Sequence, residues 1–569
     1  MEAARVVAGR PAGVSLTASQ NIVDVDGIPA AGQAGAMQMK WQQSTDGTTW
    51  ADLALTGVGP LALNVNNTTT QQTSRLLRAD ASYTDLGGNG GITHTFNDLV
   101  SGNYIIGRDG LVDALGASFT AQATMYGLTG NDTYVINNAA DVVVENLNEG
   151  TDTVEANVSA YTLAANVENL TFTGPALAAG AGTEFTGTGN ALRNILIGGT
   201  GDDVLNGVGG GDDLRGGLGN DTYVVNTTTD IVRELAGEGT DTIMTALNTF
   251  TLRANLENLS YTGAAAFSGT GNGAANIITS GNGADVLIGG QGADTIFAGG
   301  GNDTVFASFN DGNDVYHGGV GMGDTYDLSR TGAGATVNLA LGTASSNQTG
   351  VDALDGIENV IGTVSADTMT GDSQANVLTG GAGNDVFLAA ARVAGVLNDG
   401  NDTFNGDAGT DTYDISATSA GAIMNLATGR ATSTDIGSDT LNFIENLTGS
   451  QGNDTMTGNA LANVLRGGRG DDILVGGAGH DTFVFDALAG HDTIRDFSAG
   501  RAIGDVIDLN RSDFGVNSFN DLQRNGHLAA ATDGHAIIHF LDGTANAVTI
   551  DLIGVRLVDL AANDFRFHP

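Results

Sequence analysis

Residues 449–484 read GSQGNDTMT, GNALANVLR, GGRGDDILV and GGAGHDTFV, four nine-residue units in direct succession. The unit follows the template Gly-Gly-x-Gly-x-Asp-x-(large apolar)-x, and it recurs at 198–224, 280–306 and 362–388. Its first six positions predict a tight turn, because glycine tolerates positive φ, and its last three predict a short strand. A three-residue strand cannot stand alone, so the units must stack on one another. The sequence therefore predicts an all-β solenoid.

The aspartate at position six of each unit carries the chemistry. Stacked strands lie about 4.8 Å apart, so these carboxylates would form a file whose members repel one another. A hard cation between them would remove the repulsion, and the glycine backbones leave carbonyl oxygens free to complete its shell. Ligands that are all oxygen favour Ca²⁺, which takes about 6–8 of them, whereas Zn²⁺ would require His or Cys. The pattern therefore predicts multiple calcium sites.

The nonapeptide resembles the calcium-binding unit of the repeats-in-toxin (RTX) family over roughly residues 127–484. The resemblance implies a parallel β-roll with two nonapeptides per turn and Ca²⁺ between neighbouring turns. The carboxylate ligands that it implies are Asp203, Asp212, Asp221, Asp285, Asp294, Asp303, Asp367, Asp385, Asp402, Asp411, Asp454, Asp472 and Asp481. The turn glycines whose carbonyl groups it implies as further ligands are Gly199, Gly201, Gly210, Gly217, Gly219, Gly290, Gly292, Gly381, Gly383, Gly468, Gly470, Gly477 and Gly479.

Four units depart from the template. Asn194, Asn276, Asn376 and Asn463 replace the aspartate in copies that also lack the Gly-Gly pair, and these coils are expected to stack without a full-strength metal site. The alternative for the whole chain is a calcium-free solenoid rich in Gly, Asn and Asp. It is disfavoured, because solvating loops do not need Asp at one phase of nine.

The composition limits the partners. The chain of 569 residues has a net charge of −44; residues 1–110 hold 9 acidic and 6 basic residues, a net of −3, which leaves −41 for the rest. Such a polyanion repels nucleic acid and anionic membranes. No apolar run approaches the roughly 20 residues of a transmembrane helix. With no cysteine in the chain, bound metal is the expected source of cross-links. The N-terminal MEAARVVAGR lacks the apolar core of a secretory signal peptide, so either export uses another signal or the chain is part of a longer one.

The repeats are nested in longer modules. Glu149-Gly150-Thr151-Asp152 recurs 89 residues later, and Asp324-Thr325-Tyr326-Asp327 recurs 87 residues later, each module combining a β-rich spacer with a run of nonapeptides. The predicted domains are a tail (1–12), an immunoglobulin-like β-sandwich (13–105), two β-roll modules of a first type (106–310), two of a second type (311–484) and a C-terminal β cap (485–569).

Both ends of the chain carry further resemblances. Met37–Gln42 alternates apolar and polar residues before the turn that leads to Trp50, and with Leu76–Tyr83 it is similar to the immunoglobulin-like modules found beside RTX repeats. The segments 490–497, 505–509 and 564–567 resemble the C-terminal domain of serralysin-type proteins, which implies a cap that ends in an uncleaved type I secretion signal. The final His568-Pro569 departs from the usual ending.

No catalytic constellation is expected. His535 and His539 have the i, i+4 spacing of a zinc-protease helix, but the catalytic Glu is missing and the local alternation indicates a strand. Gly371-Asp372-Ser373-Gln374 resembles an esterase nucleophile block but lies in phase with the nonapeptides. The tripeptide Arg469-Gly470-Asp471 occupies positions three to five of a repeat, where Arg fills a variable slot.

Three functions follow as hypotheses. The first is a non-enzymatic, secreted calcium-binding protein that folds outside the cell and acts at a surface, in a matrix or in adhesion, with the type I secretion machinery and surface or matrix components as partners. The second is the non-catalytic portion of a larger secreted protease, lipase or peroxidase. The third, a pore-forming toxin, is disfavoured because no long apolar helix is present.

Overall fold

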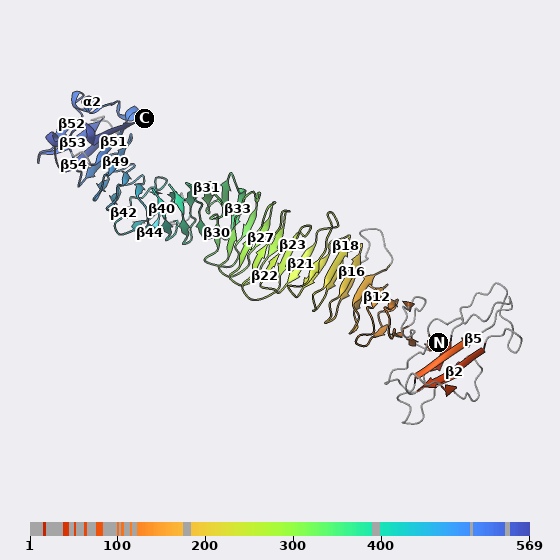
Figure 1. Ribbon diagram of the computed structural model, residues 1–569. Helices are drawn as coiled ribbons and strands as arrows, with labels where there is room; N and C mark the ends of the chain where they lie inside the picture. Colours follow the sequence, from red (N-terminus) through yellow and green to blue (C-terminus); the bar gives the residue numbers. More distant parts are fainter. Residues whose placement is uncertain are drawn as a thin grey trace. The chain divides into compact units, whose positions relative to one another are not determined.

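The computed structural model describes residues 114–116, 122–174, 184–389, 399–500, 504–540 and 547–569, together with the backbone of the strands β1 (Ser15–Ala18), β2 (Gln38–Ser44), β3 (Ala51–Asp52), β4 (Ala62–Asn64), β5 (Leu76–Ser82), β6 (Leu99–Ser101) and β7 (Tyr104–Ile106). The chain forms two compact units, residues 1–247 and 248–569. Figure 1 shows strands stacked side by side in each of them. The boundary between the units falls inside the predicted segment 106–310.

The N-terminal strands are mainly antiparallel. β2 pairs with β3 and β5, and β1 pairs with β4 and β6. β6 also pairs with β7, which in turn runs parallel to β9 (Thr124–Tyr126). The side chains of these N-terminal strands and the tail 1–12 lie outside the described residues, so the immunoglobulin-like sandwich stays a prediction.

The first unit contains two parallel sheets of a roll. One sheet has the order β20 (Ile231–Val232), β18 (Asp213–Gly217), β16 (Ile195–Gly199), β14 (Asn169–Phe172), β12 (Thr153–Ala156), β10 (Thr133–Ile136) and β8 (Ala114–Leu115). The other includes β13 (Ala160–Thr162), β15 (Thr186–Thr188), β17 (Val204–Asn206), β19 (Thr222–Val225) and β21 (Thr242–Thr245). Val204 pairs with Thr222, and Ile195 pairs with Asp213. In each pair the separation in sequence equals twice the period of the repeat, so two nonapeptides make one turn of the roll. The predicted β-roll is thus confirmed.

The second unit is built in the same way. One sheet includes β23 (Asn258–Tyr261), β25 (Ile277–Thr279), β27 (Thr295–Phe297), β29 (Val315–His317), β35 (Thr368–Thr370), β38 (Val386–Leu388), β41 (Thr412–Asp414), β45 (Asn446–Thr448), β47 (Val464–Arg466) and β49 (Thr482–Phe485). The other includes β22 (Thr249–Thr251), β24 (Ser268–Thr270), β26 (Val286–Ile288), β28 (Thr304–Phe306), β30 (Thr325–Asp327), β34 (Asn359–Ile361), β36 (Val377–Thr379), β39 (Thr403–Asn405), β46 (Thr455–Thr457) and β48 (Ile473–Val475). The neighbouring strands in these coils are parallel.

The spacers add antiparallel strands to the coils. β32 (Thr343–Ser346) lies antiparallel between β31 (Ala335–Asn338) and β33 (Gly350–Asp355). In the next module β43 (Arg430–Ser433) lies in the same way between β42 (Ile423–Asn425) and β44 (Gly437–Asn442). The outer members, β31 and β42, still run parallel to strands of the following nonapeptides, so the stack continues through the spacers.

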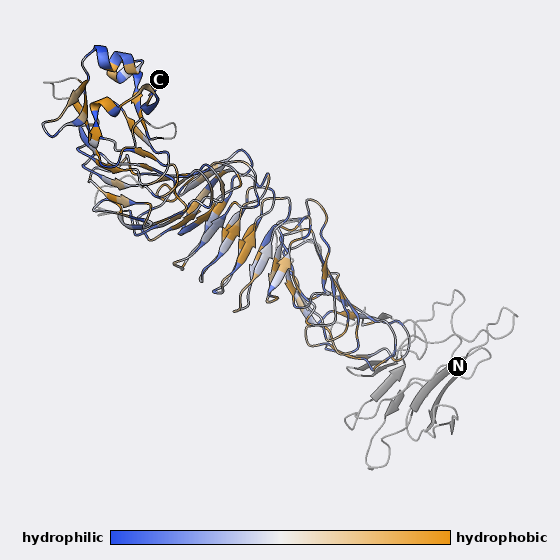
Figure 2. Cartoon of the chain, turned by 60° about the vertical axis from the view of Figure 1, so that its left-hand side comes forward, coloured by the Kyte–Doolittle hydropathy of each residue, from blue (hydrophilic) through white to orange (hydrophobic). Residues whose placement is uncertain are grey.

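The core of the roll is built by position eight of the nonapeptides. Leu196, Leu205, Leu214 and Tyr223 are fully buried, while their strand neighbours, except the buried Asp213, are at least partly exposed. Figure 2 shows apolar strand segments recurring along the stack between more polar turns. A fully buried leucine contributes about 1.5–3 kcal/mol, and a coil presents only about two such residues. Each coil therefore depends on its neighbours.

The last described segments close the stack. β51 (Val506–Asn510) pairs parallel with β49, and β55 (Phe565–His568) pairs parallel with β51. On the other sheet β54 (Val548–Arg556) pairs with β50 (His491–Ile494) and, antiparallel, with β53 (His535–Phe540). β53 also pairs with β52 (Leu528–Ala530), and two short helices, α1 (Arg511–Phe514) and α2 (Phe519–Arg524), follow β51. These strands cover the open edge of the last coil.

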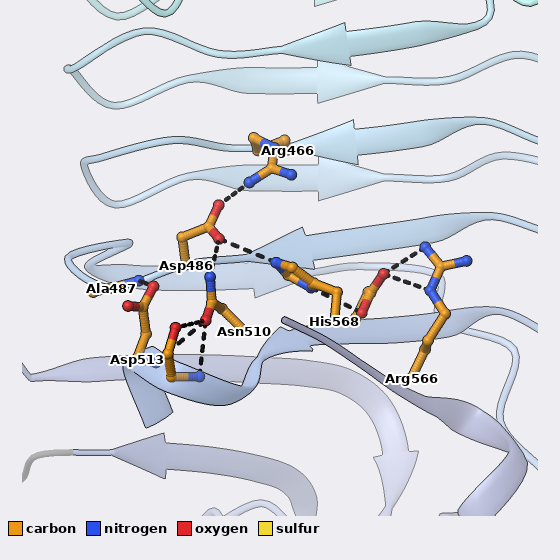
Figure 3. A network of polar contacts seen from close by, with 9 residues as sticks. Arg466, Asp486, Ala487, Asn510, Asp513, Arg566 and His568 are labelled. Atoms are coloured by element: carbon orange, nitrogen blue, oxygen red, sulfur yellow. Dashed lines mark hydrogen bonds and ion pairs between the residues drawn. The ribbon is translucent and has the colours of Figure 1, made fainter. Parts of the chain in front are cut away.

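A polar network holds the C-terminal strand to the roll (Figure 3). The imidazole of His568 lies 3.2 Å from Asp486 through Nε2 and 3.0 Å from Asp508 through Nδ1. Arg466 of β47 forms an ion pair with Asp486, and Arg566 forms one with the buried Asp508. The network thus ties β55 to coils that lie far earlier in the sequence.

Candidate calcium sites

One oxygen of each position-six aspartate holds two coils together. The Oδ1 atom of Asp221 accepts the backbone N–H of Asp203 at 2.8 Å, from the preceding coil. Asp212 accepts from Asn194 at 2.7 Å, and Asp472 accepts from Asp454 at 2.7 Å, across the same step. The side chain follows directly after the glycine turn and precedes the strand, so stacking of the strands brings each carboxylate to the backbone of the preceding coil.

The other oxygen is buried and has no hydrogen-bond partner in nine of the thirteen predicted aspartates. They are Asp203, Asp212, Asp221, Asp294, Asp303, Asp385, Asp411, Asp472 and Asp481. All nine residues are at most 1% exposed. A buried polar group that is left unsatisfied costs about 1–3 kcal/mol, and more when it is charged. These oxygens therefore require a proton or a cation.

Glycine at position one leaves room for that cation. A Cβ atom on Gly198 would lie 2.2 Å from Asp203 Oδ2 and 2.7 Å from the carbonyl oxygen of Gly216, one coil further on. The same near-contact of position one with the unpartnered oxygen recurs at Gly380 with Asp385 and at Gly467 with Asp472. The pocket wall thus combines carboxylate and carbonyl oxygens, a donor set suited to a hard cation such as Ca²⁺.

Most of the predicted carbonyl donors lie in the turns, whereas Gly199, Gly217 and Gly383 are the last residues of β16, β18 and β37 (Ala382–Gly383). Eleven of them have positive φ, from 94° to 146°: Gly210, Gly217, Gly219, Gly290, Gly292, Gly381, Gly383, Gly468, Gly470, Gly477 and Gly479. Gly199 and Gly201 face the glycines of the next coil, since a Cβ on Gly217 would lie 2.3 Å from the Gly199 oxygen and one on Gly219 would lie 2.2 Å from the Gly201 oxygen. Their role as ligands stays a prediction. The sequence reasoning missed the position-one carbonyls such as that of Gly216, which approach the unpartnered carboxylates.

Three predicted ligands are satisfied within the protein. Asp367 Oδ2 accepts the Thr363 N–H at 2.7 Å, and Asp454 Oδ2 accepts the Ser450 N–H at 2.7 Å. The hydroxyl groups of Thr363 and Ser450 also bond to these carboxylates. The structure therefore gives Asp367 and Asp454 less need of a cation than the nine.

Asp285 is the third, because the hydroxyl of Ser280 at position one contacts its Oδ2. Asp402, the remaining predicted ligand, accepts the Asn376 N–H through Oδ1 at 2.9 Å.

The asparagine coils need no cation either. Asn194 accepts the Asn190 N–H at 2.7 Å, and its Nδ2 donates to the carbonyls of Val167 at 3.0 Å and Glu168 at 3.2 Å. The other three substitutions follow the same pattern: Asn276, Asn376 and Asn463 donate to the carbonyls of Glu257, Glu358 and Glu445. The asparagine amide thus donates hydrogen bonds at a position where an aspartate would place a negative charge.

The spacers and the C-terminal segment contribute acidic groups that the sequence reasoning did not assign. Asp152, Asp324 and Asp492 each have a buried Oδ2 without a hydrogen-bond partner. Glu168 and Glu358 accept the N–H groups of Asp152 and Asp324 at 2.8 and 3.0 Å. Each of these glutamates begins a recurring Glu-Asn-(Leu/Val) motif, Glu168-Asn169-Leu170 and Glu358-Asn359-Val360, which was the available signal in the sequence.

Burial shapes the electrostatics of the aspartate files. Desolvation raises the pKa of Asp221, Asp294 and Asp472 to about 7, and neighbouring carboxylates add to the shift. The pKa of Asp492 rises to about 9 for the same two reasons, chiefly desolvation and then the charge of Asp472. A cation in contact with these carboxylates would act in the opposite direction.

The motifs that resembled catalytic sites have structural partners. His535 and His539 lie on strand β53, as the alternation predicted. His535 faces Asp533 and Asp551, and the backbone carbonyl of His539 lies 2.9 Å from Nδ1 of His527. Asp372 donates its N–H to Asn376, which makes the esterase-like block a nonapeptide turn.

Coils of two nonapeptides, with buried pockets of carboxylate and carbonyl oxygens, define a parallel β-roll of the calcium-binding class. Residues 188–223, 270–305, 352–390, 397–414 and 445–483 match the family model described as "RTX calcium-binding nonapeptide repeat (4 copies)". These stretches therefore carry RTX calcium-binding nonapeptide repeats, as the sequence resemblance predicted, and the repeats imply Ca²⁺ binding.

Two other comparisons each cover only part of the other protein. A 69-residue stretch is 45% identical to endo-1,3-1,4-beta-glycanase ExsH of Rhizobium meliloti (strain 1021), and it spans 12% of this chain and 14% of the glycanase. The extracellular lipase LipA from Serratia marcescens is similar at 16% identity with a TM-score of 0.16, over 58% of this chain and 45% of the lipase. Among the described residues, no helix has the length and apolar character needed to cross a bilayer.

Proposed function

We propose that the chain is a secreted calcium-binding protein whose roll folds outside the cell when it binds Ca²⁺. The observation that carries the proposal is the set of nine buried aspartate oxygens without hydrogen-bond partners. Bound Ca²⁺ would neutralise these carboxylates and link neighbouring coils. Their Oδ1 atoms already tie each coil to the one before, so folding and metal binding involve the same side chains.

The charge and the affinity class support folding after export. The net charge of −44 lies almost wholly in the region of the repeats, and unneutralised it opposes compaction. Extracellular calcium modules have dissociation constants of about 10⁻⁴–10⁻³ M, well above cytosolic calcium. The chain would thus stay unfolded during transport by the type I machinery, for which residues 485–569 would carry the signal, and would fold on release.

A non-enzymatic role at a surface, in a matrix or in adhesion fits a chain that is mostly roll. The runner-up is the carrier portion of a larger secreted enzyme, since one protein with a similar stretch is named a glycanase. Coding sequence directly upstream of Met1 distinguishes the two: a continuous reading frame with a catalytic motif favours the carrier, and a stop codon favours the stand-alone protein.

The folding proposal is tested by circular dichroism and light scattering. The full chain, freed of metal with EDTA, should lack the β signal and have an expanded radius. Millimolar Ca²⁺ should restore both, while the same concentration of Mg²⁺ serves as the control, because Mg²⁺ demands a rigid octahedral shell. A β signal that is the same with EDTA and with Ca²⁺ would overturn the proposal.

A further inference from the structure

Two clusters of three carboxylates lie at the ends of nonapeptide runs in the first unit. They are Asp132, Glu145 and Asp152, and, one module later, Asp221, Glu234 and Asp241. In each cluster one ligand oxygen from every residue lies within 4.8 Å of the others. We propose that these clusters are a second type of calcium site. They bind Ca²⁺ more tightly than the sites between two nonapeptide coils, because a glutamate from the spacer adds a third charge. This inference rests on the proposed calcium binding of the roll.

The first cluster is built around Glu145. Its Oε2 atom is buried without a hydrogen-bond partner, and so is Oδ2 of Asp152; the two residues are 7% and 1% exposed. Asp152 Oδ1 meanwhile accepts the N–H of Asp132 at 2.8 Å. Two nearly fully buried carboxylates therefore direct free oxygens into one small space.

The geometry shows why glutamate stands here. In the ordinary sites the next coil contributes the carbonyl of a position-one glycine, but counting back from Asp152 places Leu147 at that position. Glu145 approaches from the same spacer instead, and a Cβ on Gly127 would lie 2.3 Å from Asp132 Oδ2 and 2.7 Å from Glu145 Oε1. A glutamate side-chain oxygen thus faces the position-one glycine where a backbone carbonyl oxygen does elsewhere.

A tyrosine orients the glutamate in both clusters. The hydroxyl of Tyr134 donates to Glu145 Oε1, which leaves Oε2 for a ligand. In the second cluster Tyr223 donates to Glu234, and its hydroxyl accepts the N–H of Gly216 at 2.6 Å.

The second cluster repeats the carboxylate geometry as well. Asp241 Oδ1 accepts the Asp221 N–H at 2.8 Å, as Asp152 does from Asp132, and Oδ2 of Asp221 is buried without a hydrogen-bond partner. The glutamate and the second aspartate follow the first aspartate at identical spacings in the two clusters. The same arrangement, built twice, indicates a site and not an accident of packing.

The physical consequence is an order of filling. Calcium affinity in oxygen sites rises with the number of charged ligands, so the clusters should fill at a lower calcium concentration than the sites with two aspartates. Each cluster also joins a nonapeptide coil to a spacer coil. The first ions bound would therefore fasten the junctions between modules.

The test is a direct calcium-binding isotherm of the full chain by equilibrium dialysis. The wild type should show two tight equivalents ahead of the main phase. Glu145→Gln and Glu234→Gln should each remove one of them, the double variant should remove both, and the affinity at those sites should fall by at least about tenfold. Glu155→Gln is the matched control, since it removes one charge from the partly exposed outer side of β12.

A second readout keeps the test decisive if the double variant folds poorly. Tb³⁺ bound in a cluster lies beside a tyrosine, so the earliest Tb³⁺ luminescence excited through tyrosine should fall in each single variant but not in Glu155→Gln. Two tight equivalents in the double variant would overturn this inference alone. A wild-type chain that binds no calcium in any phase would instead overturn the proposed function.

Discussion

Protons should substitute for calcium in folding the roll, and this prediction can be worked out from the buried aspartates. The perturbation is complete removal of metal by dialysis, followed by a change of pH. At pH 8 the nine unpartnered oxygens would be charged, and at about 1–3 kcal/mol each they would oppose folding by roughly 10–30 kcal/mol. A typical net stability is only about 5–15 kcal/mol, so the metal-free roll should be unfolded at pH 8.

The sign of the pH effect follows from the raised pKa values. Asp472 has a pKa of about 7 and Asp492 one of about 9 in the folded chain, against the ordinary 3.8. Between pH 3.8 and these raised pKa values, the folded state binds more protons than the unfolded state. The stability that the bound protons contribute is therefore fully present below pH 3.8 and is lost as the pH rises through 7 to 9. A protonated Oδ2 also becomes a donor, and in the ordinary sites a glycine carbonyl such as that of Gly216 lies near it.

The assay is circular dichroism of the metal-free chain between pH 4.5 and 8.5, with light scattering to separate folding from precipitation. The β signal should appear on acidification without calcium, and millimolar Ca²⁺ should restore it at pH 8. A metal-free chain that is fully folded at pH 8 would refute the reasoning about the buried carboxylates. A soluble chain that stays unfolded at pH 4.5 would refute the claim that protons can substitute for calcium in folding the roll.

Four substitutions test the local claims. Gly207→Ala should displace Asp212, whose Oδ2 would lie 1.9 Å from the new Cβ, and should cost about 1–3 kcal/mol in calcium-bound thermal unfolding. At Gly209 an added Cβ would meet nothing within 4 Å, so Gly209→Ala should be neutral. Equal losses of stability in the two variants would contradict the claim that glycine at position one leaves room for the cation. Asp472→Ala should increase hydrogen exchange in its own and adjacent coils while leaving 198–224 protected, and uniform loosening would argue against modular stacking. Arg566→Ala removes a partly exposed ion pair and should lower stability by about 1 kcal/mol; an unchanged melting temperature would count against the network of Figure 3.

Much of the repeat architecture could be predicted from the sequence because its signals are local. Glycine at fixed phases demands turns, the short strand that follows cannot survive unstacked, and the register that pairs Val204 with Thr222 is twice the period. The same period places aspartate in files. The antiparallel strands β32 and β43 could not be predicted, because pairing within a spacer depends on which strands the neighbouring coils leave available.

The differences among the predicted ligands were harder to see in the sequence. Asp367 and Asp472 occupy the same phase, yet Thr363 satisfies the first with its N–H and hydroxyl while the second keeps a buried oxygen unpartnered. From the sequence alone, a serine or threonine in the turn gives no sign that it will form hydrogen bonds with the aspartate of the same unit. The asparagine coils were recognisable by the lost charge, but their bonds to the glutamate carbonyls of the preceding coils were not.

By itself the sequence determined that this chain is a stacked roll with calcium-type ligands, because turn, strand and carboxylate repeat with one period and each needs only its neighbours in the chain. Only the tertiary structure decided which carboxylates lack a partner, which glycine carbonyls face them, and that Glu145 joins Asp132 and Asp152. The physical reason is distance along the chain: those groups are well separated in sequence, and only the closing of a coil brings their oxygens into one pocket.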